Sequence, residues 1–508
     1  MKLQILLILL LASAVSSSEF QWFPLGNWIE EEGTPDLAGH CVANSMDGNI
    51  IAVSAPHYAP EGEEGLRFGR VVVYKFDELT DAWSKLGDEI IGKEGDSFGW
   101  SLGMSDDGKS IIVGSLSDHD EKAKAGKAEI FILDDVTGSE KWIRKGQELF
   151  GKNAFDEFGY SVGIRDGGGV IAIGSPGEDN IEVIDGDDAG AVRVYKWDSS
   201  ENTWIEVENV IKGKKQRGRY GQSLALSQVG VIAIGAPGAD GSTGMVDMIR
   251  YNATSADWTT DGIITLPTAI KEGDMFGYSV SISFDGGTVA IGAPRHRGND
   301  NHGLKDSGVV IVYKYNLGVS TWTQIGDEII GNRAGDQAGT SVHLSESGVE
   351  VAIGSPFSSM NGPESGHIAV YNLVGTVWSK MQLDIDGKKA YNNLGASVAL
   401  SGDGQQVMGG APTEGYATVY QLAKTASPTS SPTFSPDVKR TSAPRKKITW
   451  FAITFLIVFS GLLVFAAVKI LLFVRNKRSL ASFQATAADD LEMTPHGVPT
   501  DGDTRDVI

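Results

Sequence analysis

The chain has 508 residues, a formal net charge of −22 at pH 7 and a single cysteine. This acidic balance argues against nucleic acids and anionic membrane surfaces as partners, although it suits cations and basic ligands. One cysteine cannot form an internal disulfide, so a chain that enters an oxidising compartment must be stabilised by a large packed core.

The first 18 residues have the features of a secretory signal peptide. Lys2 precedes an apolar run over residues 3–11, and small residues follow that run. An apolar run of this length, followed by small residues, is typical of a cleaved signal rather than a membrane anchor. We therefore expect the chain beyond residue 18 to leave the cytosol.

A serine motif recurs along the chain. The stretch FGYSVGIRDGGGVIAIGSP (158–176) contains Gly-x-Ser-x-Gly, the pattern of a hydrolase nucleophile elbow centred on Ser161. A nucleophile is needed once, whereas a residue that a repeat architecture requires recurs at a fixed period. The equivalent position recurs in six further copies as Cys41, Ser101, Ser223, Ser279, Ser341 and Ser397. We therefore predict that Ser161 is a structural small residue where strands crowd together.

Each repeat is typical of four short β-strands. In the third copy they cover residues 160–164, 170–176, 190–197 and 202–213, with a glycine-rich turn between the first two. No segment between residues 20 and 423 sustains a 3.6-residue period, so long helices are not expected. The fourth strand carries one tryptophan per repeat: Trp83, Trp142, Trp204, Trp258, Trp322 and Trp378.

The seventh repeat ends after its third strand, and the missing strand is found at the other end of the chain. WFPLGNWIEEEG (22–33) resembles WSKLGDEIIG (83–92) and places Trp22 in the tryptophan position. Pairing of the two termini in one blade closes a ring without an open end. We predict an all-β, seven-bladed propeller with four-stranded blades over residues 20–423, in preference to an open solenoid or a pair of β-sandwiches.

The recurring pattern FG-x-S-V followed by V-A-I-G-A-P resembles the FG-GAP repeat, which is known from the propeller head of integrin α-subunits. The resemblance covers nearly all of residues 20–423 and implies that ligands bind the upper face, formed by the loops between strands 2 and 3 and between strands 4 and 1. Integrin-like heterodimers are not implied, because the chain shows no counterpart of the thigh and calf domains or of the G-F-F-K-R-type sequence that follows the integrin membrane helix.

Calcium-binding repeats of that family carry D-x-D/N-x-D-G between strands 1 and 2, whereas the equivalent loops here offer at most two carboxylates and are typical of hairpin turns. The best remaining cation candidate is the acidic loop over residues 176–190. It carries Glu178, Asp179, Asp185, Asp187 and Asp188. Its spacing matches no known calcium loop, and a solvated acidic loop is the alternative interpretation. No other cofactor is expected.

Candidate ligand-binding residues lie in the predicted upper-face loops: His57, Tyr58, His119, Asp240, Arg295, His296 and Arg297. The last three form a basic point on an acidic body and suit an acidic ligand such as a sulfated or carboxylated glycan. The alternative interpretation is that these residues do not bind a ligand: the basic residues of blade 5 occur together by chance, and the loop histidines are simply solvated. His40 and His343 lie beside first strands but do not assemble into a catalytic set, and no P-loop or H-E-x-x-H motif occurs.

The chain beyond the propeller is expected to form a stalk, a membrane span and a tail. Residues 424–447 are rich in Ser, Thr and Pro and suit an O-glycosylated stalk. Residues 448–474 are apolar over a length that crosses a bilayer as a helix. Basic residues flank this span on both sides, so the signal peptide decides that residues 475–508 form a disordered cytosolic tail. Its last three residues suit a cytosolic adaptor of the PDZ type.

Together these features predict a single-pass type I protein of the plasma membrane. The sequon at Asn252 predicts N-glycosylation of the exported part. We expect the propeller to bind an extracellular protein or glycan, for adhesion, recognition or attachment to a cell wall or matrix. A structural role or a sorting receptor of an internal membrane is the alternative, and an enzyme with a site in the central funnel is a third interpretation.

Overall fold

The computed structural model describes residues 20–424, apart from residues 31–35, 64, 117–122, 135–139, 166, 184–185, 208, 253–256, 265–266, 268–269 and 298–303. The predicted signal peptide and membrane span, the tail, and the stalk beyond Lys424 lie outside the described residues. Within the described part, no helix is long and apolar enough to cross a membrane.

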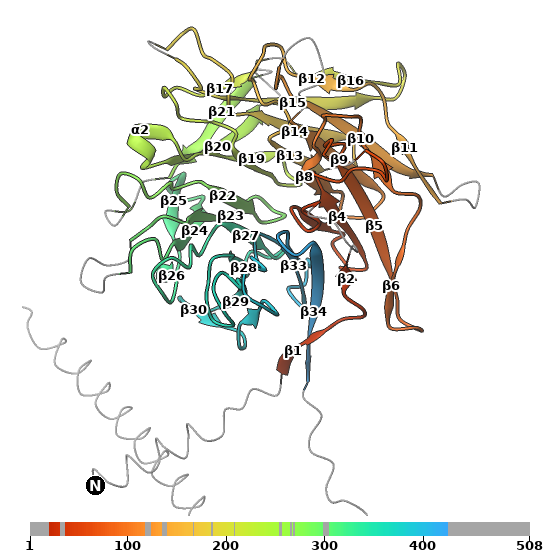
Figure 1. Cartoon of the computed structure of the whole chain (residues 1–508). Helices are drawn as coiled ribbons and strands as arrows, with labels where there is room; N and C mark the ends of the chain where they lie inside the picture. Colours follow the sequence, from red (N-terminus) through yellow and green to blue (C-terminus); the bar gives the residue numbers. More distant parts are fainter. Residues whose placement is uncertain are drawn as a thin grey trace, which may run out of the picture. The chain divides into compact units, whose positions relative to one another are not determined.

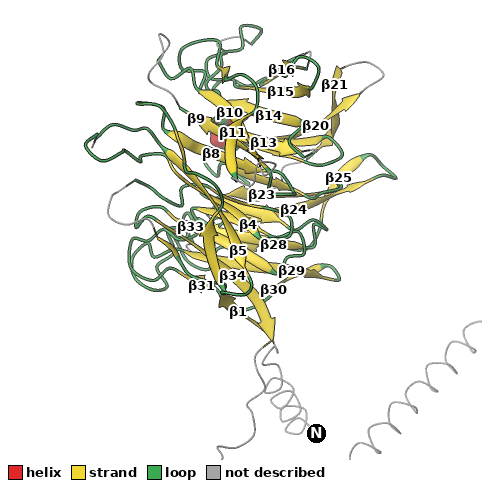
Figure 2. Ribbon diagram, turned by 90° about the vertical axis from the view of Figure 1, so that its right-hand side faces the viewer, coloured by secondary structure: helices red, strands yellow, loops and turns green. Residues whose placement is uncertain are grey.

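Seven antiparallel sheets follow one another around a ring in chain order (Figure 1). Strands and loops form nearly all of this unit (Figure 2), and one short helix, α2 (Ala239–Ser242), is found among the described residues. The first strands of successive sheets contact one another and are therefore innermost. This confirms the predicted all-β, seven-bladed propeller with four-stranded blades.

The first three blades have the following strands. Blade 1 contains β3 (Val42–Asn44), β4 (Ile50–Ala55), β5 (Arg70–Asp77), β6 (Ala82–Lys85) and β7 (Ile90–Ile91). Blade 2 contains β8 (Phe98–Met104), β9 (Ser110–Ser115), β10 (Lys127–Asp134), β11 (Lys141–Arg144) and β12 (Leu149–Phe150). Blade 3 contains β13 (Ser161–Arg165), β14 (Val170–Ser175), β15 (Ala191–Asp198), β16 (Thr203–Glu206) and β17 (Ile211–Lys212).

The other four blades repeat this plan. Blade 4 contains β18 (Ser223–Leu226), β19 (Val231–Ala236), β20 (Met245–Asn252) and β21 (Asp257–Ile263). Blade 5 contains β22 (Ser279–Ile282), β23 (Thr288–Ala293), β24 (Val309–Asn316), β25 (Thr321–Gln324) and β26 (Ile329–Ile330). Blade 6 contains β27 (Ser341–Leu344), β28 (Glu350–Ser355), β29 (His367–Val374), β30 (Val377–Lys380) and β31 (Ile385–Asp386). Blade 7 contains β32 (Ser397–Leu400), β33 (Gln406–Ala411), β34 (Tyr416–Lys424), β1 (Phe20–Pro24) and β2 (Ile29–Glu30).

The outer strand is interrupted in most blades, and the neighbouring tryptophan explains why. In blade 1, β6 and β7 both pair with β5, and the chain between them turns at Gly87 with φ 78°. Trp142 of blade 2 packs here, and its Nε1 donates to the Leu86 carbonyl at 2.8 Å. A Cβ on Gly87 would lie 3.0 Å from the Trp142 ring. Glycine turns of this kind receive five of the tryptophans on the preceding blade: Trp83, Trp142, Trp204, Trp322 and Trp378.

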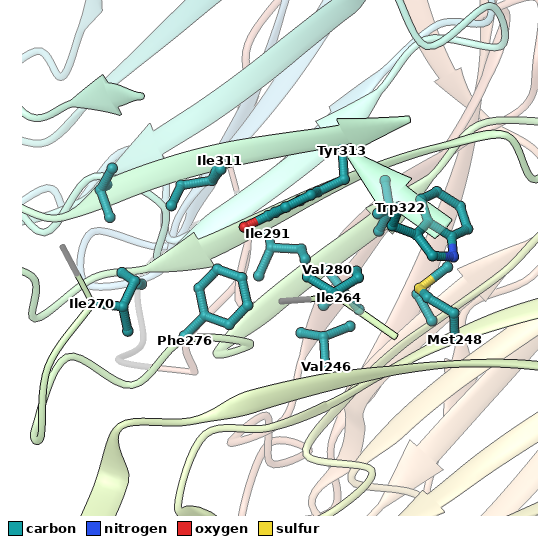
Figure 3. Close-up of a cluster of buried hydrophobic side chains, with 14 of the residues drawn as sticks. Val246, Met248, Ile264, Ile270, Phe276, Val280, Ile291, Ile311, Tyr313 and Trp322 are labelled. Carbon is teal, nitrogen blue, oxygen red and sulfur yellow. The ribbon is translucent and has the colours of Figure 1, made fainter. Parts of the chain in front are cut away.

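Apolar side chains fill the space between neighbouring blades. Between blades 4 and 5, Val246 and Met248 face Val280, Ile291 and the buried Trp322 (Figure 3). The strands are apolar at these positions because one face of each sheet is covered by the preceding blade and the other face by the following blade. The core is thus a series of inter-blade layers, which is how a chain without disulfides is stabilised.

The recurring serine links each blade to the next. Ser161 Oγ donates to the carbonyl of Gly221 in blade 4 at 2.7 Å. A Cβ on Gly174, which is paired with Ser161, would lie 2.1 Å from the same carbonyl, so the contact requires glycine. The equivalent bond is made, at 2.7–2.8 Å, by Ser101, Ser223, Ser279 and Ser341. The predicted structural role of Ser161 is confirmed.

The two ends of the chain close the ring. β1 pairs antiparallel with β34, and Trp22 lies opposite Leu422 as the other tryptophans lie opposite their third strands. Leu25 and Ile29, which flank this pairing, are buried in the core between blades 7 and 1. Closure by the termini is therefore as the sequence predicted.

We expect the Ser161→Ala substitution to lower the free energy of unfolding by about 1 kcal/mol, because one hydrogen bond between blades is lost. Denaturant titration of the variant measures this, with Ser199→Ala as the control at an exposed position. A variant that keeps its unfolding free energy but loses a specific function would show instead that Ser161 acts chemically.

Deletion of residues 20–30 should destabilise the propeller by about 3–6 kcal/mol, because Leu25 and Ile29 leave the core. The deletion also leaves β34 as an unpaired edge, which promotes aggregation. Thermal unfolding and light scattering measure both effects, and deletion of residues 475–508 is the control. Unchanged unfolding would contradict ring closure by β1.

Candidate functional site at the mouth of the central channel

One position of the repeat lines the mouth of the central channel on the upper face, which carries the loops between strands 2 and 3 and between strands 4 and 1. It immediately precedes the recurring serine or cysteine, where each innermost strand begins. Its occupants are all half-buried and differ in chemistry: His40, Trp100, Tyr160, Gln222, Tyr278, Thr340 and Ala396. The repeat thus holds the backbone constant while this side chain varies.

Aromatic rings from the first three blades lie in a row across this mouth. The ring centroids of His40 and Trp100 are 4.9 Å apart, and those of Trp100 and Tyr160 are 5.8 Å apart. The guanidinium of Arg219, from the loop that enters blade 4, lies over the Tyr160 ring at 5.5 Å. We call His40, Trp100, Tyr160, Arg219 and their polar neighbours the mouth cluster.

Arg219 is held in place by two polar neighbours. Its Nη2 is 2.7 Å from Glu157 Oε2, and its Nε donates to Gln222 Oε1 at 2.9 Å. The side chains of Arg219 and Glu157 remain 32% and 25% exposed, so the ion pair is open to a ligand. Glu157 and Gln222 therefore complete the mouth cluster and balance its charge.

Burial favours the neutral forms of two histidines and one tyrosine at the mouth. Burial, with a smaller effect of His57, lowers the pKa of His40 to about 4. Burial likewise lowers the pKa of His57, and the positive charge of the nearby Arg67 lowers it further. Burial and the nearby Tyr278 raise the pKa of Tyr160 to about 12. At neutral pH the two histidines and the tyrosine are uncharged, and the only charges of the cluster are those of Arg219 and Glu157.

This arrangement suits non-covalent binding. Aromatic faces beside a few planar hydrogen-bonding groups are typical of sites that hold a polar ring-shaped ligand. The nearby Ser161 hydroxyl is already donated to Gly221, so it is not poised as a nucleophile. The cluster can therefore bind and orient a ligand through its rings and its planar polar groups.

The lower end of the channel is lined differently. A cavity of about 180 Å³ is bordered by Met104, Ile164 and Leu226 of the innermost strands and by polar residues that include Asp106, Gln228 and Glu346. The turns between strands 1 and 2 are joined around it by backbone hydrogen bonds, such as Gly402 N to Met46 O at 2.7 Å. These turns frame the lower end of the channel.

His343 is part of this lower wall. Its Nδ1 accepts a hydrogen bond from the Leu400 backbone N–H at 3.2 Å, and burial lowers its pKa to about 4. A neutral ring is needed to accept this bond, so the residue satisfies a strand edge that would otherwise be unpaired. His343 and His40 lie at opposite ends of the channel and do not form one catalytic set.

The predicted upper-face residues of blades 1 and 4 are placed as follows. His57 is half-buried beside His40, at the edge of the mouth cluster. Tyr58 carries the guanidinium of Arg70 over its ring at 4.1 Å. Asp240, in α2, forms an exposed ion pair with Lys215 at 2.8 Å. His119 lies outside the described residues.

The three basic residues predicted to bind a ligand in blade 5 differ in their exposure. Arg295 and Arg297 are exposed, whereas His296 between them is buried. His296 Nδ1 lies 2.8 Å from the buried Asp274 Oδ2, so this ring fixes the loop. The two arginines remain available for the predicted acidic ligand, and their role in binding stays a prediction.

The predicted cation loop in blade 3 is partly occupied by internal contacts. Glu178 is bound by the buried Arg193, whose Nη2 donates to Glu178 Oε1 at 2.7 Å. Asp179 Oδ1 accepts from the Asp188 backbone N–H at 3.0 Å, and Asp187 is exposed. Asp185 lies outside the described residues.

Among the residues that the structure describes, no three His, Cys, Asp or Glu side chains are placed to hold a metal ion. Calcium binding therefore stays a prediction. Asn252, the predicted glycosylation site, is exposed at the end of β20, while the threonine of its sequon lies outside the described residues.

No protein-family model matches the chain, and no curated protein matches it.

Sequence reasoning missed most of the mouth cluster. Trp100, Tyr160 and Tyr278 stand between the invariant glycine and serine of the motif, so they look like part of the repeat. Arg219 stands two residues before the same glycine in only one repeat. The signal that identifies the aromatic members is variation. The residue between the glycine and the serine or cysteine is aromatic, amide, hydroxyl or small in different repeats, whereas the glycine on one side and the serine or cysteine on the other hardly change.

The histidines predict a pH dependence of stability. Folding lowers the pKa of His343 from 6.5 to about 4, so the unfolded chain takes up the proton first as the pH falls. Its contribution to stability is complete above pH 6.5 and is lost as the pH falls toward 4. The His343→Gln variant still offers an acceptor to Leu400 N–H. Between pH 6.5 and 4 we expect its free energy of unfolding to fall by about 2 kcal/mol less than that of the wild type. Denaturant titration at several pH values measures the difference, and parallel curves would contradict it.

Proposed function

We propose that the chain is an FG-GAP-type propeller receptor, a single-pass type I membrane protein that binds an extracellular protein or glycan through its upper face. The observation that carries the proposal is the mouth cluster, in which aromatic rings and a fixed Arg219 from different blades converge on one partly exposed place. Convergence of such groups is typical of binding sites. The seven repeats, six centred on serine and one on Cys41, and the propeller fold support the FG-GAP assignment.

The direction of the chain supports a role at a membrane. β34 runs from the upper face at Tyr416 to the lower face at Lys424, because it is the third strand of its blade. The predicted stalk and membrane span follow from there, so the tether leaves from the face opposite the mouth cluster. The loops of the upper face lie at the other end of β34 from Lys424, and they are the proposed ligand contacts.

Binding fits the mouth cluster better than catalysis does. His40 is neutral in a buried environment, Ser161 is engaged between blades, and Arg219 and Glu157 neutralise one another. No pair of these groups provides a nucleophile beside a general base. We therefore propose a receptor and not an enzyme. Arg295 and Arg297 are proposed as a second contact region for the ligand. Residues 475–508 are proposed to bind a cytosolic adaptor.

The proposal is tested in two measurements. A tag placed after residue 18 of the full chain should be reached by antibody on intact cells, whereas a tag after residue 508 should not. The purified propeller, residues 19–424, should bind members of a panel of extracellular matrix proteins and glycans. Labelling only after permeabilisation would favour the sorting receptor of an internal membrane, and turnover of a test substrate without any bound ligand would overturn the receptor proposal.

A further inference from the structure

We propose that the mouth cluster is a binding site for a neutral saccharide. This inference rests on the proposed function and names the ligand class of the same site. Trp100 and Tyr160 are neighbours on adjacent blades, with ring centroids 5.8 Å apart and ring planes inclined at 59°, and Arg219 lies over one face of Tyr160. A half-buried aromatic ring beside polar groups matches a pyranose ring, which combines C–H surfaces with hydroxyl groups at its rim.

A cationic ligand is disfavoured, because the cluster already holds a cation. The Arg219 guanidinium lies over Tyr160 at 5.5 Å, which takes the ring face that a ligand ammonium or guanidinium would use. A second positive charge would also be repelled by Arg219. The cluster therefore differs from an empty aromatic cage.

An anionic ligand is disfavoured for a related reason. The charge of Arg219 is balanced by Glu157 at 2.7 Å, and His40 is uncharged at neutral pH because burial lowers its pKa to about 4. A carboxylate or sulfate entering the cluster would meet Glu157 as well as Arg219. The net charge of −22 on the whole chain adds long-range repulsion.

The polar groups of the cluster suit pairs of hydroxyls. Arg219 donates from a rigid fork, Gln222 both donates and accepts, and Glu157 accepts. The mutual hydrogen bonds of 2.9 Å and 2.7 Å hold these three groups in fixed positions before a ligand arrives. Vicinal hydroxyls, each a donor and an acceptor, can bridge neighbouring members of this set. The aromatic faces and this fixed polar set together define a saccharide site.

The test uses the purified full chain in detergent and titration calorimetry. The neutral probes are the hexasaccharides of α-1,4-glucose, β-1,4-glucose, β-1,3-glucose and β-1,4-mannose, and the acidic probes are oligogalacturonate and heparin. We expect at least one neutral probe to bind. Trp100→Ala should weaken that binding about ten-fold, and Trp100→Phe, which keeps an aromatic face and protects the fold, should weaken it less. Tyr391→Ala removes an exposed upper-face aromatic outside the cluster and is the matched control.

Each outcome is decisive. Binding of a neutral probe that both Trp100 variants retain in full would place the saccharide elsewhere and overturn the inference. Binding of the acidic probes alone, or of none of the saccharides, would also overturn it. If no saccharide binds but a matrix protein does, the saccharide inference fails and the proposed receptor function stands. If neither saccharide nor protein binds, both proposals fail.

Discussion

The close approach of one blade to the next at the recurring serine is the contact on which the ring depends. The hydroxyl of Ser161 reaches the Gly221 carbonyl at 2.7 Å only because Gly174 lacks a side chain. A larger residue at either position would separate the two innermost strands. The same contact is made in blades 2 to 6 and sets the spacing of those blades around the central channel, whereas Ser397 of blade 7 accepts a hydrogen bond from Val42 N–H of blade 1.

This constraint explains where the chain can vary. The aromatic residue before the glycine is buried between blades, as with Phe158 and Phe276, and the serine is committed to the next blade. The position between them faces neither neighbouring core, so its side chain is free to change. The aromatic members of the mouth cluster therefore arise at a place where the repeat imposes a backbone path without imposing a side chain, and Glu157 and Arg219 come from a second varied position, two residues before the glycine.

Buried charge organises the loops around the mouth. A carboxylate stands in the loops that enter five of the seven innermost strands, and it accepts backbone hydrogen bonds there, as Asp96 does from Lys93 N at 2.8 Å; blade 4 has Gly218 and blade 7 has Asn392 at this position. Its second partner differs between blades: Lys127 lies 2.6 Å from Asp96, and His296 lies 2.8 Å from Asp274. These pairs stiffen the upper-face loops, because breaking a buried pair leaves an uncompensated charge. The site is thus built on rigid loops.

The sequence by itself determined the number of blades, the closure through Trp22 and the structural role of Ser161. These three features could be predicted because the sequence repeats at a near-constant spacing. A side chain that recurs at the same place in every repeat meets the same environment in every blade. Only the tertiary structure decided which varied residues meet. His40, Trp100 and Tyr160 are far apart in the chain and come together because they occupy the same repeat position on adjacent blades, and Arg219 joins them from the loop that enters blade 4. The burial of His296 against Asp274 was likewise set by packing between two loops, which no local pattern encodes.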